Sequence, residues 1–455
     1  MAHHRVASVS LGLVLSLAAP SSAPSSTQRG AGDLSPDQLA RLWDAEHVSP
    51  PIPALLGHAD VVRRLDDLSK SAAGLFQVVR AGESVEGRSI HHVRAGTGPS
   101  GVLLWSQMHG DEPTATSALF DLFEYLRRHR DEPVARRILG ALTLHVVPML
   151  NPDGAERFER RNAQGVDINR DALRLQTPEG RILKELRDRH EPRIGFNLHN
   201  QGWRTSIGDP PRPASISLLS VAYDEARTEN AGRRLTKRLC VVIRDALEPL
   251  APGQIGRYDD AFEVRAFGDN ITRWGTPVVL IETGAWASAD PDPALVRLNF
   301  VALVTALDAL ASGRVDRADV RAYEELPLNE SRLFAVLIRN AILIPGSGIP
   351  PFTADVGITA ARRVRGEGAR RDLQTVLNVD DLGDLRTSSG LQSIDATGMT
   401  VIPATSDSIE PGQVIDLPEW RTRVATPVAV GQPARLALVK PAAEPGKFAV
   451  EMVIR

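Results

Sequence analysis

The sequence predicts an α/β fold with a mixed central sheet flanked by helices, followed by a small all-β domain. Up to about residue 313, short apolar runs that suit buried strands alternate with longer stretches of helical periodicity. From about Phe334 onward, short β-like runs are broken by Gly, Pro, Asp and Asn. The chain has 455 residues, of which 42 % are hydrophobic, so it can form two or three domains with sizeable cores.

The first 44 residues are expected to lie outside the folded domains. A basic start is followed by an apolar run, Val6–Ala19, and then by small residues, which is typical of a secretory signal peptide cleaved near Ala23 (residues 1–23). This run is too short to span a bilayer, and no other segment approaches that length. Residues 24–44 are predicted to be a flexible lead-in. The mature protein is therefore expected to be secreted or periplasmic, without a membrane span.

The first domain is predicted to cover residues 45–313. The stretch 115–126 shows the periodicity of an amphipathic helix, because its apolar residues recur three and four positions apart. The expected strands are Phe76–Val79, Ile90–Val93, Gly101–Ser106, Leu142–Pro148, Ile194–Leu198, Ile216–Val221 and Val278–Ile281, and the expected helices are Val61–Leu68, 115–126, 178–190, 225–248 and 293–311.

Composition excludes some function classes. The net charge is −3 and the basic residues are scattered among acids, so no nucleic-acid partner is expected. Cys240 is the single cysteine of the sequence, which excludes an intramolecular disulfide.

Polar residues stand where three apolar runs end. His109 and Glu112 follow Gly101–Ser106, His199 ends the run RIGFNLH, and Glu282 ends the run PVVLIE. Sites in open α/β sheets form outside the carboxyl ends of the strands. Zinc in a hydrolase takes three protein ligands and keeps a fourth position open. His109, Glu112 and His199 therefore predict a zinc site, with Glu282 beside it.

Five segments resemble, in order, those of the zinc metallocarboxypeptidase family, the carboxypeptidase A-like enzymes and their peptidoglycan-cleaving relatives. They are MHGDEP, NPDG, RRNAQGVDINRD, NLHN and LIETG, and the resemblance covers about residues 45–312. It implies one zinc per chain, bound by His109, Glu112 and His199. It also implies that Asp167 orients a ligand histidine and that Glu282 is the general base.

The same resemblance implies the substrate contacts. Asn169 and Arg170 match the pair that binds the terminal carboxylate, for which a guanidinium offers a fork of donors. Arg160 matches the arginine that stabilises the oxyanion, and Arg161 is the adjacent contender. The sequence departs from the family at Asn197, where an Asp usually stands. The family's flexible tyrosine has no clean match: Tyr258 is the nearest candidate, but it is more simply a packing residue.

Residues 330–455 resemble the small β-sandwich domain of amidohydrolases, without the metal-binding barrel. Since no histidine follows His199, we expect this part to be structural or to position substrate.

The sequence thus predicts a secreted zinc metallocarboxypeptidase that cleaves the last peptide bond of peptides with a free C-terminal carboxylate. One alternative is a peptidoglycan stem-peptide amidase or a deacylase of N-acyl amino acids, although the NPDG and DINR segments count against the deacylase. The non-enzyme alternative is a peptide-binding pseudo-enzyme, against which the complete set of ligands and base counts.

Overall fold

The computed structural model describes residues 33–72, 74–288, 290–345, 349–366, 370–404, 409–423 and 427–455. The predicted signal peptide and residues 24–32 of the predicted lead-in lie outside these residues, so export stays a prediction.

The prediction of a flexible lead-in over residues 24–44 is wrong for the residues of that segment that the structure describes. Residues Pro36–Glu46 form helix α1, which begins with a capping box: the Ser35 hydroxyl accepts from the Gln38 amide, and the Gln38 side chain accepts from the Ser35 amide. The Trp43 indole donates to a carboxylate oxygen of Asp121 at 2.6 Å. This contact fixes α1 on the first domain, because it satisfies two buried polar side chains.

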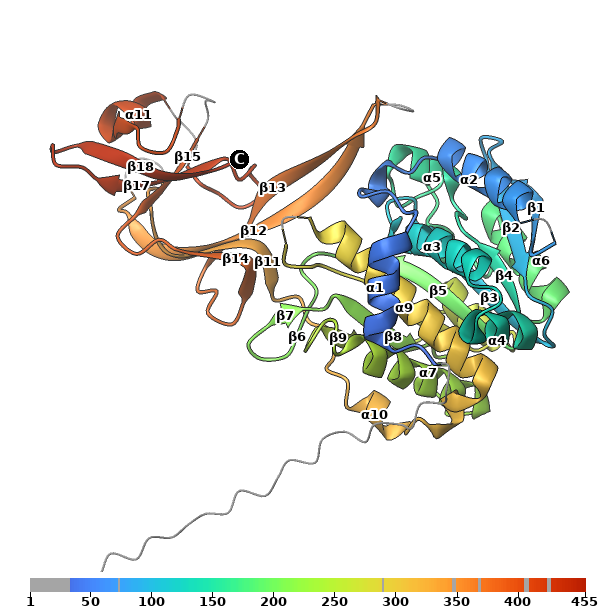
Figure 1. Cartoon of the computed structure of the whole chain (residues 1–455). Helices are drawn as coiled ribbons and strands as arrows, with labels where there is room; N and C mark the ends of the chain where they lie inside the picture. The colour runs from blue at the N-terminus through green and yellow to red at the C-terminus, as the bar shows by residue number, and fades with distance from the viewer. Residues whose placement is uncertain are drawn as a thin grey trace, which may run out of the picture. The chain divides into compact units, whose positions relative to one another are not determined.

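A mixed sheet forms the centre of the first domain (Figure 1). In the described residues it has eight strands in the order β1-β2-β4-β3-β5-β10-β8-β9. Strands β3, β4, β5 and β10 are mutually parallel, whereas β2 and β8 run antiparallel to β4 and β10. The strands are β1 (Phe76–Glu83), β2 (Ser89–Ala95), β3 (Ser100–Ser106), β4 (Leu142–Val147), β5 (Ile194–Asn200), β8 (Ile216–Ser220), β9 (Ile255–Arg257) and β10 (Val278–Thr283), with a separate pair β6 (Ser206–Ile207) and β7 (Arg212–Pro213).

Helices pack against both faces of this sheet, which explains why its parallel strands are apolar on both sides. One face packs on α1, α2 (His58–Ser71), α3 (Thr114–Arg128), α4 (Pro133–Ala141), α7 (Ala231–Leu247) and α9 (Pro291–Ser312). The other packs on α6 (Pro178–His190) and α8 (Phe267–Arg273). The shorter helices are η1 (Pro53–Leu55), α5 (Pro152–Arg157), η2 (Ile168–Arg170), η3 (Arg314–Arg317) and α10 (Arg321–Glu324).

Helix α9 is the one described helix that is long and apolar enough to cross a membrane. However, 78 % of its most apolar stretch is buried within the protein. A helix that is apolar all round is expected in the core of a large domain.

The C-terminal residues form a second sheet, in which the described strands follow the order β13-β12-β11-β15-β17-β18-β16 and β14 pairs with β11. The strands are β11 (Leu333–Leu343), β12 (Phe352–Arg365), β13 (Asp372–Gly383), β14 (Ser389–Asp395), β15 (Thr400–Pro403), β16 (Val414–Asp416), β17 (Leu436–Pro441) and β18 (Lys447–Ile454), with helix α11 (Leu417–Arg423).

The predicted fold class is confirmed in both parts: a mixed α/β sheet between helices and a separate C-terminal sheet. One of the short β-like runs of this part, VAVG at residues 428–431, suggests a strand by its composition but forms a bend and a turn. The likeness of this part to the amidohydrolase sandwich stays a prediction.

Candidate metal centre and active site

The predicted site residues come together because three neighbouring strands end at the same edge of the first sheet. Strand β5 lies between β3 and β10, parallel to both. The register pairs Ser106 with Leu198, and Glu282 with His199. The carboxyl ends of these strands therefore present their side chains to one place, as the sequence predicts.

The turn after β3 delivers two side chains to that place. Gln107 has a positive φ of 52°, which turns the chain sharply away from the strand. The Glu112 amide then donates to the His109 carbonyl at 3.2 Å, closing a turn just before α3 begins at Thr114. His109 and Glu112 consequently project to the same side.

The three predicted ligands converge on one point. Glu112 Oε1 lies 2.7 Å from His109 Nδ1, and Glu112 Oε2 lies 2.6 Å from His199 Nδ1. The two Nδ1 atoms are 3.2 Å apart. All three residues are buried, with exposed fractions of 2 % for His109, 6 % for Glu112 and 2 % for His199.

The chemistry of this donor set fits zinc. Two imidazole nitrogens and a carboxylate oxygen are ligands that zinc commonly takes in catalytic sites. The lone pairs of these three donors lie close to one point, and a cation bound there would stabilise this arrangement. In the described structure, the buried Glu282 Oε2 also lacks a hydrogen-bond partner, so a polar group faces the site without a protein contact.

The site strongly perturbs its titratable groups. Burial alone would raise the pKa of Glu112, but His199 and His109 outweigh it and lower that pKa. Burial and the charge of Glu112 both raise the pKa of Glu282 well above its usual value. A divalent cation at the three donors would lower the pKa of Glu282 again, because it would offset the Glu112 charge.

Asp167 and Arg160 surround the outer side of His109. His109 Nε2 donates to Asp167 Oδ1 at 3.1 Å, and since a carboxylate can only accept, this contact leaves the Nδ1 lone pair free for a metal. Arg160 donates from Nε to Asp167 Oδ2 at 3.1 Å, and its Nη1 lies 3.0 Å from His109 Nδ1. Arg161 instead donates to the Gly165 carbonyl. The structure therefore brings Arg160, and not Arg161, to the cluster.

Asn169 and Arg170 lie in the short helix that follows Asp167. The Asp167 side chain accepts from the Asn169 amide and so caps this helix. Asn169 Oδ1 accepts from the Phe267 amide at 2.9 Å, which ties the turn to α8. Arg170 is partly exposed and lies 3.5 Å from a Glu263 oxygen. Arg170 Nη1 also donates to the Asn169 carbonyl at 2.8 Å, but the guanidinium keeps further donors for a ligand, because its ion pair with Glu263 is long and partly exposed.

Tyr258, the candidate for the family's flexible tyrosine, follows β9 and is 37 % exposed. Its pKa is raised by partial burial and then by the charges of Glu282 and Glu112. Asn197 is buried, and its side-chain oxygen has no partner among the described atoms.

A second group of histidines also has nitrogen atoms within 4.8 Å of one another: His92, His145 and His190. His92 Nε2 and His145 Nδ1 lie 3.1 Å apart, so these two imidazoles hydrogen-bond to each other, and the His190 ring stacks on both. Burial lowers the pKa of each of these imidazoles, and the charge of Arg94 lowers it further and would also repel a cation. This group suits a metal less well than the first.

Comparison with known proteins agrees with the site. Residues 61–192 match the model of the zinc carboxypeptidase family. Over 181 residues the chain is 28 % identical to carboxypeptidase SOL1 of Arabidopsis thaliana, covering 35 % of this chain and 37 % of that protein. Over 159 residues it is 32 % identical to carboxypeptidase 2 of Trichophyton tonsurans, covering 34 % of this chain and 28 % of that protein.

Among solved structures, a metallo-carboxypeptidase from Burkholderia cenocepacia aligns with a TM-score of 0.44 and 20 % identity, over 55 % of this chain and 69 % of that one. The chain spans only 37 % of the length of carboxypeptidase SOL1 and 28 % of the length of carboxypeptidase 2. The match to the family model confirms the resemblance to the zinc carboxypeptidases for residues 61–192, which include His109, Glu112, Asp167 and the arginines beside them but not His199 or Glu282. Zinc is accordingly the metal that the donor set is expected to bind.

Proposed function

We propose that this protein is an exported zinc carboxypeptidase that hydrolyses the C-terminal peptide bond of peptides. The observation that supports this most is the convergence of His109, Glu112 and His199 beside the unpartnered carboxyl of Glu282. A zinc ion bound there would supply Lewis acidity, which polarises a carbonyl and acidifies water. One zinc per chain is expected.

The remaining residues have separable roles in this proposal. Glu282 takes a proton from the attacking water and later gives it to the leaving nitrogen, because a carboxyl outside the ligand set is needed to move that proton. Arg160 stabilises the negative charge that develops on the carbonyl oxygen. Asp167 holds His109 and Arg160 in orientation through its two oxygens.

The free terminal carboxylate distinguishes this function from an internal amidase. We expect kcat/KM to fall about 10–100-fold when the substrate carboxylate is replaced by an amide, because hydrogen bonds to charged groups contribute ~1.5–3 kcal/mol. The measurement compares the free acid and the amide of one peptide on the mature enzyme, whose first residue should be Pro24 if the predicted export cleavage occurs.

Two variants show whether Arg170 is the residue that binds the terminal carboxylate of the substrate. Arg170→Ala should lower kcat/KM on the free acid toward its value on the amide, so that the difference between the two peptides largely disappears. Arg161→Ala is the control and should retain the difference, since its guanidinium faces the Gly165 carbonyl. Equal rates on acid and amide with the wild-type enzyme would rule out a carboxypeptidase and favour the amidase alternative.

A further inference from the structure

Strands β12 and β13 form a long hairpin of which only one half belongs to the core of the second sheet. They pair from Asp355 opposite Gly383 to Arg365 opposite Asp372. The proximal half contributes Ala354, Val356 and Ile358 to the hydrophobic core. Beyond Thr359 the sequence reads AARRVR and supplies no residue to that core. Contacts outside this core must therefore hold the distal half of the hairpin in position.

Contacts with the first domain hold the distal half in position. Arg362 Nη1 donates to Asp292 Oδ1 at 2.7 Å, and the Arg362 guanidinium lies 5.1 Å from the ring centroid of Trp203. Asp292 is nearly buried, in the first turn of α9. Arg371, which precedes β13 and is also buried, donates to the carbonyls of Ala155 and Ala54. The hairpin is thus fastened beside the predicted active site.

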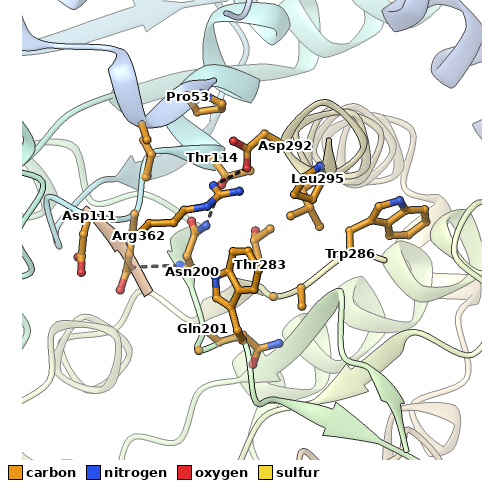
Figure 2. Close-up of a pocket in the computed structure, with 18 of the residues that line it drawn as sticks. Pro53, Asp111, Thr114, Asn200, Gln201, Thr283, Trp286, Asp292, Leu295 and Arg362 are labelled. Atoms are coloured by element: carbon orange, nitrogen blue, oxygen red, sulfur yellow. Dashed lines mark hydrogen bonds and ion pairs between the residues drawn. The ribbon is translucent and has the colours of Figure 1, made fainter. Parts of the chain in front are cut away.

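Between the hairpin and the metal centre lies a pocket of about 370 Å³, which we name the upstream pocket. Glu112 and Arg160 line it on the metal side, and Ala360 and Arg362 on the hairpin side. Figure 2 shows the Arg362 side chain extending toward Asp292, with Thr114 and Asn200 beside it. The rest of the wall includes residues 200–203 and 283–286 at the ends of β5 and β10, together with Pro53, Ala54, Phe158 and Leu295.

The position of this pocket indicates which part of a peptide enters it. Asn169 and Arg170, which the family resemblance assigns to the terminal carboxylate, do not line it. A peptide with its last residue at Arg170 and its scissile carbonyl beside Glu112 and Arg160 must therefore direct its earlier residues into the upstream pocket. There the chain meets the β12 wall.

We propose that the β12–β13 hairpin limits the substrate of this site to short peptides, with Arg362 as the residue that closes the upstream pocket. The inference rests on the proposed function. The pocket volume is at the lower end of the ~300–1,000 Å³ typical of small-molecule sites, so it accommodates a few residues, and the β12 wall stands in the path of a longer chain. The substrates are then fragments left by other peptidases, not the tails of intact proteins.

A series of peptides from dipeptide to decapeptide, all with the same last two residues, tests this proposal on the full chain. For the wild type, kcat/KM should fall by about tenfold or more once the peptide outgrows the pocket, which is the discrimination that one group in a substrate site supplies. Replacing residues 361–376 by Asn-Gly, a dipeptide suited to a two-residue turn, should remove this fall, because Ala360 opposite Leu377 becomes the last strand pair.

Three point variants refine the test. Arg362→Ala should raise kcat/KM on the decapeptide and leave the value for the dipeptide, which does not reach the hairpin, within about twofold. Ala360→Trp, on the same strand face, should instead lower the tripeptide value and spare the dipeptide. Arg363→Ala is the control, because its side chain lies on the opposite face and does not line the pocket. These variants decide the question if the shortened hairpin does not fold.

Failure of this inference can be distinguished from failure of the proposed function. A length profile that is flat in the wild type, or unchanged in folded hairpin variants that contain zinc and cleave the tripeptide, would overturn the inference alone. If the zinc-loaded wild type cleaves no peptide in the series, the proposed function fails and the inference fails with it.

Discussion

Replacing Glu282 with Gln is expected to lower kcat by about 10²–10⁴-fold, the range for loss of general acid–base catalysis. Gln keeps the size and shape of the side chain but cannot take a proton from water. Glu282 is the penultimate residue of β10, lies beside His199 and is not one of the three donors, so zinc content should stay at the wild-type level. Folding should also survive, because the change removes a buried carboxyl that has an unpartnered oxygen.

The measurement is kcat on a free-acid peptide together with zinc content and the thermal unfolding midpoint. Glu185→Gln is the matched control, since Glu185 is an exposed residue of α6 and should show no change. A Glu282→Gln protein that contains zinc and turns over peptide near the wild-type rate would show that another group moves the proton.

Replacing His199 with Ala is expected to remove zinc and, with it, activity. Loss of a hydrogen-bond partner of a ligand, as in Asp167→Asn, typically weakens metal binding about 10–100-fold. Loss of a ligand should exceed that, because only His109 and Glu112 would remain of the three converging donors. Zinc content after dialysis against a weak chelator is the direct readout.

His190→Ala is the control for this second prediction. It changes the stacked group of His92, His145 and His190, in which His92 and His145 hydrogen-bond to each other near the charge of Arg94, and should leave zinc content unchanged. If zinc were lost from the His190 variant and retained by the His199 variant, the stacked group would be the zinc site, and His199 would not be a zinc ligand.

Much of the first domain could be predicted because its strands are continuous apolar runs that end in polar residues. Gly101–Ser106, Ile194–Leu198 and Val278–Ile281 all lie within observed strands. No single apolar run indicates the order of the strands in the sheet. However, parallel α/β topology brings the carboxyl ends of the strands to one edge, so His109, His199 and Glu282 could be expected to lie together.

The sequence could not show which of two neighbouring arginines contacts the site. Arg160 and Arg161 have the same chemistry, and which of them faces His109 depends on the turn that follows α5. Helix α1 is a different case. Ser35, Pro36 and Gln38 form a recognisable helix start, but the Ser- and Pro-rich surroundings favoured a flexible segment.

The hairpin lay beyond what sequence patterns can show. Strand β13 carries charged residues and is half exposed, so its alternation is weak, and it is defined mainly by pairing with β12. The ion pair between Arg362 and Asp292 joins residues 70 positions apart. No local signal predicts such a contact, which depends on how the two sheets pack.

The most direct test of the central claim is a zinc titration of the metal-free enzyme, followed by release of the C-terminal residue from a free-acid tripeptide. We expect no measurable hydrolysis without metal and a linear rise in activity that saturates at one zinc per chain, at the site formed by His109, Glu112 and His199. Full activity in the metal-free protein, or activity that requires a second zinc, would contradict the account.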